Sequence, residues 1–245
     1  MKILPLASLL LLGLISACEL RDPDQGIKTE EIISLQVSSD ELVADGQDLI
    51  LVQAELGSQA IPNLSVTFNT SQGQFETSSG GTATTIDRVA SGRTATATLV
   101  AGTAAQNRVL VSATVTGTDP ERGTLSFQAD TVITFLPAFP TLLELNLDDT
   151  EIEAVEGNST SLTVNLLRNS GLVSEGMEVF FEAIPISDPA AIVEINSKAI
   201  ADLQSVTAEV TVGDTIAGKV LLRAWVLETA TDTAAKGEIE LSLTP

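Results

Sequence analysis

The stretch Val109–Val115, with the sequence VLVSATV, recurs 111 positions later (from 109 to 220) as Val220–Val226, with the sequence VLLRAWV. In both copies the first, third, fifth and seventh residues are apolar and suit a buried face. This alternation with a period of two predicts a β-strand that has one side in a core and the other side turned outward. A strand that recurs at a fixed distance also predicts that the chain contains two modules of one design.

Other strand patterns recur at nearly the same separation, which drifts by only a residue or two. Insertions therefore fall in loops, while the order of the strands is kept. No segment holds a helical period of 3.6 for long enough to predict a helix. The chain is predicted to be an all-β tandem duplication. The matching pairs are Ala97 with Ala208, Leu99 with Val210, Leu64–Phe68 with Met177–Phe181, and Gly46 with Gly157.

The boundary between the modules is predicted at residues 136–140, which contain Pro137 and Pro140. Proline lacks the amide hydrogen that a sheet needs, so it ends a strand, and two prolines stiffen a connection. The modules then cover residues 31–135 and 141–245. Each has about the length of an immunoglobulin-like β-sandwich, in which two sheets pack face to face.

One set of turn and strand residues in the first module carries a resemblance to a known family. The set is Ala44–Gly46, Pro62, Val66–Phe68, Ser71, Gly73, Phe75, Gly92, Ala95 and Leu99. With these residues the first module resembles the invasin/intimin-type bacterial immunoglobulin-like domain. The second module resembles it less, because Ile184–Pro189 replaces the Ser-x-Gly-x-Phe turn. The resemblance implies two tandem seven-stranded sandwiches of a kind used in surface stalks and adhesins, with no catalytic residues to carry over.

The N-terminal segment has the form of a secretory signal peptide. Met1-Lys2 precedes the apolar run Ile3–Ile15, which is shorter than the roughly 20 residues that span a bilayer. Leu14–Cys18 (LISAC) ends in the sole cysteine and resembles the bacterial lipoprotein lipobox. The resemblance implies that residues 1–17 are cleaved and that Cys18 carries acyl chains such as palmitate. The alternative is an ordinary signal peptide that leaves Cys18 as a free thiol.

Residues 18–30 follow as a polar tether with no periodic apolar positions. Glu19 stands where enteric bacteria place the aspartate that retains lipoproteins in the inner membrane. The lipoprotein resemblance therefore implies an outer-membrane protein, facing either the periplasm or the cell surface.

Composition argues against most catalysis. The chain has no His and one Cys, so it cannot form a Ser-His-Asp system, a His-ligated metal site or a thiolate cluster. Its 33 acidic and 12 basic residues give a net charge of -21, which is unfavourable for nucleic-acid binding. Paired carboxylates can indicate glycoside hydrolysis, but among so many acidic residues such pairs arise by chance. We expect no enzymatic activity and no cofactor.

A candidate partner-binding face follows from the alternation in the second module. Since Val220, Leu222, Ala224 and Val226 match the inward set, the residues between them must point outward. Phe180 points outward on an earlier strand, and in an immunoglobulin sandwich these two strands are neighbours. Such an apolar patch with a charged rim is typical of a contact surface for a protein, a glycan or a second copy. The alternatives are a β-bulge that shifts the register and a loop that covers the patch. The predicted face consists of Phe180, Leu221, Arg223, Trp225 and Leu227.

An acidic cluster after the linker offers a weaker hypothesis. Asp148, Asp149 and Glu151 carry oxygen ligands of the kind that calcium takes. A solvated acidic edge that discourages aggregation between strands explains the cluster as well.

Together these observations predict a membrane-anchored bacterial envelope lipoprotein that acts as a non-catalytic adhesion or interaction module. Two alternatives remain open: an accessory structural subunit of an envelope assembly or transport complex, and a carbohydrate-binding module.

Overall fold

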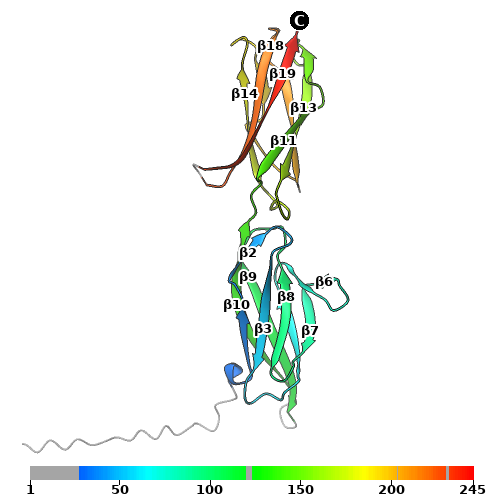
Figure 1. The fold of residues 1–245 in the computed structure, drawn as a ribbon, viewed down its shortest axis with the longest axis vertical. Coiled ribbons are helices and arrows are strands. Elements are labelled where there is room, and N and C mark those ends of the chain that lie inside the picture. The colour runs from blue at the N-terminus through cyan, green and yellow to red at the C-terminus, as the bar shows by residue number, and fades with distance from the viewer. Residues whose placement is uncertain (1–27, 120–122, 203, 230–231) are drawn as a thin grey trace, which may run out of the picture.

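The computed structural model describes residues 28–119, 123–202, 204–229 and 232–245, which form two β-sandwiches placed end to end along the long axis of the molecule (Figure 1). Within these ranges there is no α-helix, and one short 3₁₀ helix, η1 (Thr29–Glu31), precedes the first strand. Cys18 and the rest of the predicted signal segment lie outside the described residues. The predicted all-β, immunoglobulin-like fold is confirmed, but the described residues form ten strands in the first sandwich and nine in the second, not the seven that the resemblance implies.

The first sandwich packs two five-stranded sheets, with the orders β1-β3-β8-β5-β6 and β2-β10-β9-β4-β7. Its first strand is split between the sheets, since β1 pairs antiparallel with β3 and β2 pairs parallel with β10. The strands are β1 (Ile33–Val37), β2 (Glu41–Ala44), β3 (Leu49–Leu56), β4 (Ser65–Thr70), β5 (Gln74–Glu76), β6 (Thr82–Ala83), β7 (Thr85–Val89), β8 (Thr94–Val100), β9 (Gln106–Asp119) and β10 (Gly123–Pro137).

The second sandwich repeats this plan, with the sheet orders β11-β13-β17-β15 and β12-β19-β18-β14-β16. The predicted repeats lie on equivalent strands: the Val109 copy is on β9 and the Val220 copy is on β18. The strands are β11 (Leu142–Leu147), β12 (Glu151–Glu153), β13 (Ser159–Leu167), β14 (Glu178–Pro185), β15 (Val193–Ile195), β16 (Lys198–Ile200), β17 (Ser205–Val212), β18 (Gly218–Leu227) and β19 (Thr233–Thr244).

Each sandwich has its own apolar core. Phe68 and Phe75 meet in the first core with ring centroids 6.0 Å apart, and Phe135 is also fully buried there. Among the buried residues described for the second core, Phe181 is the single aromatic one. Most of the others are Leu, Val and Ala. Burying one such side chain stabilises the fold by about 1.5–3 kcal/mol, so a core of this size needs no disulfide.

Both ends of the first sandwich are more ordered than the sequence suggests. Leu136 and Pro137, expected in the linker, extend β10 and pair with Val43 and Ala44 of β2. Parallel pairing with β2 gives these two residues a partner that the sequence alone does not reveal. Thr29 and Glu30, expected in the tether, belong to η1, which is followed by a hydrogen bond from the Gly57 amide to the Ile32 carbonyl.

The joint between the sandwiches is formed by the β13–β14 loop, which lies against the β2–β3 turn. Ser174, which is fully buried, donates its hydroxyl to the Ala44 carbonyl at 2.8 Å and accepts the Ala138 amide at 2.8 Å. The Glu175 amide donates to the Thr103 carbonyl at 2.9 Å. The serine thus ties both sandwiches to the linker.

Asp45 takes part in an ion pair at this joint. Its carboxylate accepts Nη1 of Arg168 at 3.2 Å, and its carbonyl accepts the Leu172 amide at 2.7 Å. Gly171 has a φ of +70° and lies directly against the Asp45 carboxylate. A Cβ atom at position 171 would come within 2.6 Å of Cγ of Asp45. Because these contacts come from both sandwiches, the joint holds them in a fixed relation.

Candidate functional site: the outer face of the β14–β18 sheet

The predicted aromatic pair lies on the outer face of the second sandwich, toward one end of the paired strands β14 and β18. Phe180 on β14 is directly opposite Trp225 on β18, with ring centroids 5.8 Å apart and planes inclined by 17°. The strand neighbours of Trp225, Ala224 and Val226, have no exposed surface, whereas Trp225 is partly exposed. The register of β18 against β19 does shift between Val226 and Leu227, but the extra residue is Ala234 of β19, so the direction of Trp225 is unchanged.

The remaining members of the predicted face are also on the outer side of β18. Leu221, Arg223 and Leu227 are partly exposed, in strict alternation with buried neighbours. The five residues therefore share one surface, which we call the aromatic face.

Arg223 organises the polar part of the aromatic face. Its Nε donates to Glu238 at 2.9 Å and its Nη1 donates to Glu182 at 3.0 Å, so one guanidinium joins three strands. The hydrogen bond to Glu238 is the main reason that the pKa of Arg223 is raised above its ordinary value. The group stays cationic at any physiological pH and holds a fixed position beside Trp225.

Lysines flank the aromatic pair at both ends of its row. Register places Lys198 of β16 beside Phe180, and Lys236 of β19 beside Trp225. Lys198 pairs with Glu178 at 2.7 Å, while Lys236 forms no ion pair with any described residue. Across four neighbouring strands, Lys198, Phe180, Trp225 and Lys236 thus form a row in which an aromatic pair lies between two cations.

The distribution of basic residues sets this face apart. The second sandwich contains Arg168 at the joint and four further basic residues, all on this face: Lys198, Lys219, Arg223 and Lys236. The outer side of the opposite sheet instead carries threonines, such as the Thr163 and Thr207 pair, together with Glu144 and Glu209.

A shallow groove of about 310 Å³ marks the aromatic face, lined by Glu182, Arg223, Trp225, Thr233 and Lys236. An indole beside hydrogen-bonding groups suits a ligand that has both apolar and polar parts. The equivalent strands of the first sandwich carry Thr67, Ser112 and Thr114 instead.

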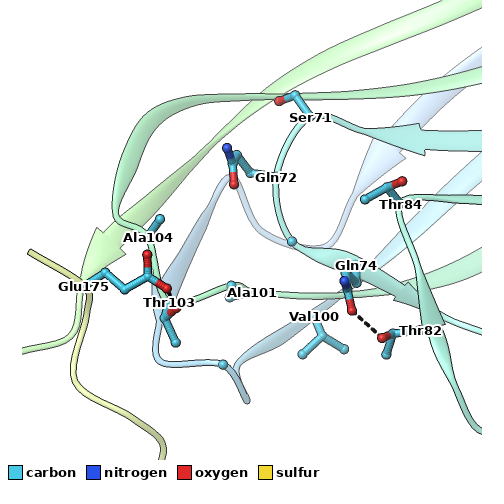
Figure 2. Close-up of a pocket in the computed structure, with 13 residues that line it drawn as sticks. Ser71, Gln72, Gln74, Thr82, Thr84, Val100, Ala101, Thr103, Ala104 and Glu175 are labelled. Carbon is cyan, nitrogen blue, oxygen red and sulfur yellow. Dashed lines mark hydrogen bonds between the residues drawn. The ribbon is translucent and has the colours of Figure 1, made fainter. Parts of the chain in front are cut away.

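A second groove, of about 570 Å³, lies beside the joint (Figure 2). Gln72, Gln74, Thr82 and Thr84 line it from the first sandwich, and Gln74 accepts a hydrogen bond from the Thr82 hydroxyl. Glu175 enters from the second sandwich and is the single ionisable residue among those that line the groove. Its carboxylate accepts the Thr103 hydroxyl, so the groove offers no acid and base pair.

The calcium candidates are not brought together. Asp148 and Asp149 lie in the turn after β11, and Glu151 begins β12. Thr160 fixes that turn, because its hydroxyl accepts the Asp149 amide at 3.0 Å. Across the described ranges, no group of three or more acidic or cysteine residues is placed so that it could hold a metal ion.

Sequence reasoning missed two features of the molecule, namely the joint and the flanking lysines. Gly46 matches Gly157, but the residues before these glycines differ: Asp45 in the first module and Glu156 in the second. This difference was a signal that the first turn has a special contact. The lysine row depends on the register of two flanking strands, which the alternation within one strand cannot supply.

No helix in the described part of the chain is both long enough and apolar enough to cross a membrane.

Comparison with known proteins shows which solved structures have a similar fold. No protein-family model matches the chain, and no curated protein matches its sequence. Among solved structures, the Yersinia pseudotuberculosis adhesin InvE matches 89% of this chain and 60% of its own, with 21% identity and a TM-score of 0.53. Invasin, described as a bacterial integrin-binding protein, matches 86% of this chain and 39% of its own, with 15% identity and a TM-score of 0.55.

The chain thus spans 60% of the InvE structure and 39% of the invasin structure. At these identities the likeness concerns the fold and not the ligand. The chain has a tandem immunoglobulin-like fold similar to that found in InvE and invasin.

Proposed function

We propose that the chain is a non-catalytic adhesion and interaction module of a bacterial envelope, anchored through lipid on Cys18 and contacting its partner through the aromatic face. The observation that carries the proposal is the stacked Phe180–Trp225 pair on a sheet surface that would otherwise be solvated. Aromatic and arginine side chains are the residue types that contribute most to binding at interfaces. The similarity of the fold to that of an adhesin supports the same function.

The joint supports a role in presentation. Contacts from Asp45 and Ser174 hold the second sandwich on the first, so the first sandwich would act as a spacer between the tether and the aromatic face. A tether after Cys18 would give reach, and the stiff pair of sandwiches would carry the face outward from an outer membrane. The net charge of -21 keeps such a surface soluble and disfavours nucleic acid as a partner.

A carbohydrate-binding module is the second candidate function. The groove at Trp225 supports it, because an indole with Arg223 and Glu182 beside it can stack on a sugar ring and bond its hydroxyls. A glycan array probed with the full chain tests this candidate, and binding that vanishes in Trp225→Ser would favour it.

Substituting the aromatic pair should abolish adhesion. In Phe180→Ser with Trp225→Ser, each contact loses about 2 kcal/mol or more, which is about 30-fold in affinity. The measurement is attachment of cells that display the chain, or of beads coated with it, to epithelial cells, to bacterial cells and to immobilised glycans.

The matched control is Leu142→Ser with Leu167→Ser, a cross-strand pair of exposed leucines on the opposite sheet. Circular dichroism must show that both double variants are folded. Attachment that is equal in the wild type and in the aromatic variant would refute the role of this face.

Replacing Cys18 by serine should release the chain from the membrane. Each buried methylene of an acyl chain contributes about 0.8 kcal/mol, so several acyl chains anchor the protein stably. In detergent phase separation, the wild type is expected in the detergent phase and Cys18→Ser in the aqueous phase. Mass spectrometry that finds an unmodified Cys18 thiol in the wild type would contradict lipid anchoring.

A further inference from the structure

Beyond Lys219, the outward side chains of β18 form a series that is complementary to its own reverse. Along the strand they are Leu221, Arg223, Trp225 and Leu227. When two copies face each other with their β18 strands antiparallel and centred on Ala224, Leu221 of one copy lies opposite Leu227 of the other. Arg223 of one copy then lies opposite Trp225 of the other. Indole and guanidinium attract each other through the quadrupole of the ring, and two leucines bury apolar area.

The neighbouring strand β19 continues the match. Register places Lys236 beside Trp225 and Glu238 beside Arg223. The same reversal therefore brings Lys236, which has no ion-pair partner among the described residues, over Glu238 of a second copy. Opposite charges at this contact attract each other, and Lys236 gains the ion pair that the described residues of its own chain do not give it.

Parallel arrangements do not give this match. With a two-fold axis along the strands between β14 and β18, Lys236 would lie over Lys198 of the other copy. With the axis along β18 itself, Arg223 would lie over Arg223. Both place like charges in contact, so the charge pattern selects the antiparallel arrangement.

We propose that the aromatic face binds the same face of a second copy of this chain, with the β18 strands antiparallel. The proposal rests on the proposed function, because it names the partner of that face. In Figure 1, β18 runs along the long axis, and the first sandwich lies at one end of the molecule. Antiparallel stacking points the two first sandwiches in opposite directions, so the pair joins two opposed surfaces, as in homotypic adhesion between cells.

The size of the face makes each contact weak. Four strands about 4.8 Å apart, contacted over about six residues each, give a footprint of roughly 400 Å² per copy, or about 800 Å² over the two copies. This total is below the roughly 1,200 Å² of total burial found in stable complexes. Many copies on one surface multiply weak contacts, so adhesion between surfaces is expected where a dilute solution holds monomers.

Cross-linking tests the arrangement. Two forms of the full chain, Leu221→Cys and Leu227→Cys, each also carry Cys18→Ser so that the new thiol is the sole one. A short bismaleimide suits sheets stacked about 10 Å apart. At high concentration the mixture of the two forms should give dimer about tenfold faster than either form alone.

The pair Leu142→Cys and Leu167→Cys on the opposite sheet is the control and should give no such acceleration. A reaction of each form alone that is as fast as that of the mixture would indicate a parallel pair and overturn the inference. The absence of dimer in every combination would overturn it as well.

Coated beads separate this inference from the proposed function. Wild-type beads should aggregate with one another, and Trp225→Ser beads should not. If wild-type beads stay dispersed but attach to foreign cells in a manner that depends on Trp225, the homotypic inference is wrong and the proposed function stands. If no attachment of either kind depends on Trp225, both are wrong.

Discussion

Replacing Asp45 with alanine is expected to destabilise the first sandwich by about 2–4 kcal/mol and to release the second sandwich from its fixed orientation. One carboxylate oxygen of Asp45 accepts the amides of Gln47 at 2.9 Å and Asp48 at 2.8 Å, and the other accepts Arg168. The residue is 7% exposed, so alanine leaves the two turn amides with little access to water. Each lost hydrogen bond costs about 1–1.5 kcal/mol, and an unpaired partly buried guanidinium adds to that cost.

Asp45→Asn separates the two effects. The amide oxygen of asparagine can still accept the turn amides, but it gives Arg168 no opposite charge. Stability to urea, followed by circular dichroism, should therefore fall clearly in Asp45→Ala and only slightly in Asp45→Asn. The distribution of distances between spin labels on the two sandwiches should broaden in both variants.

Asp48→Ala is the matched control, because the Asp48 carboxylate accepts the Val43 amide at 2.8 Å within the first sandwich. It should lower stability without broadening the distribution of distances. An unchanged distribution in both Asp45→Ala and Arg168→Ala would show that this ion pair does not hold the joint.

The alternation in the sequence was sufficient to predict the faces of the strands. Arg223 and Trp225 could be placed outward because a slip of one residue would have put Leu222 and Ala224 in water. The neighbourhood of Phe180 and Trp225 needed one further step, which was the strand order of an immunoglobulin sandwich. That order holds here, since β14 pairs with β18.

The sequence could not predict which loops meet at the joint. Asp45 and Arg168 are 123 positions apart, and their contact depends on the angle between two separately packed bodies. Local patterns specify strands and turns, whereas this angle follows from the complete shape of both surfaces. For a similar reason β10 continues two residues into the predicted linker at 136–140, since Leu136 and Pro137 pair with β2 from far along the chain.

Gly237→Val should destabilise the second sandwich by about 3 kcal/mol, at the upper end of the range for overpacking. Valine favours strands more than glycine does, so local propensity predicts the opposite sign. Gly237 lies opposite Ala224 and faces inward, where β11 crosses β19. A Cβ there would come within 2.8 Å of the Leu143 carbonyl oxygen, a backbone atom that cannot move without disturbing β11.

Gly117→Val is the matched control, because this glycine also lies in a strand, and a Cβ there meets no atom within 4 Å. It should leave stability unchanged or raise it by up to about 1 kcal/mol. Trp225, the sole tryptophan of the chain, lies in the second sandwich, so its fluorescence reports the effect of Gly237→Val on that sandwich. Circular dichroism, which follows the strands of both sandwiches, reports the effect of Gly117→Val on the first sandwich. If Gly237→Val unfolded at the wild-type denaturant concentration, the close crossing of β11 and β19 would not exist in solution. The position of the sheet that carries the aromatic face would then not depend on the packing of β11 against β19.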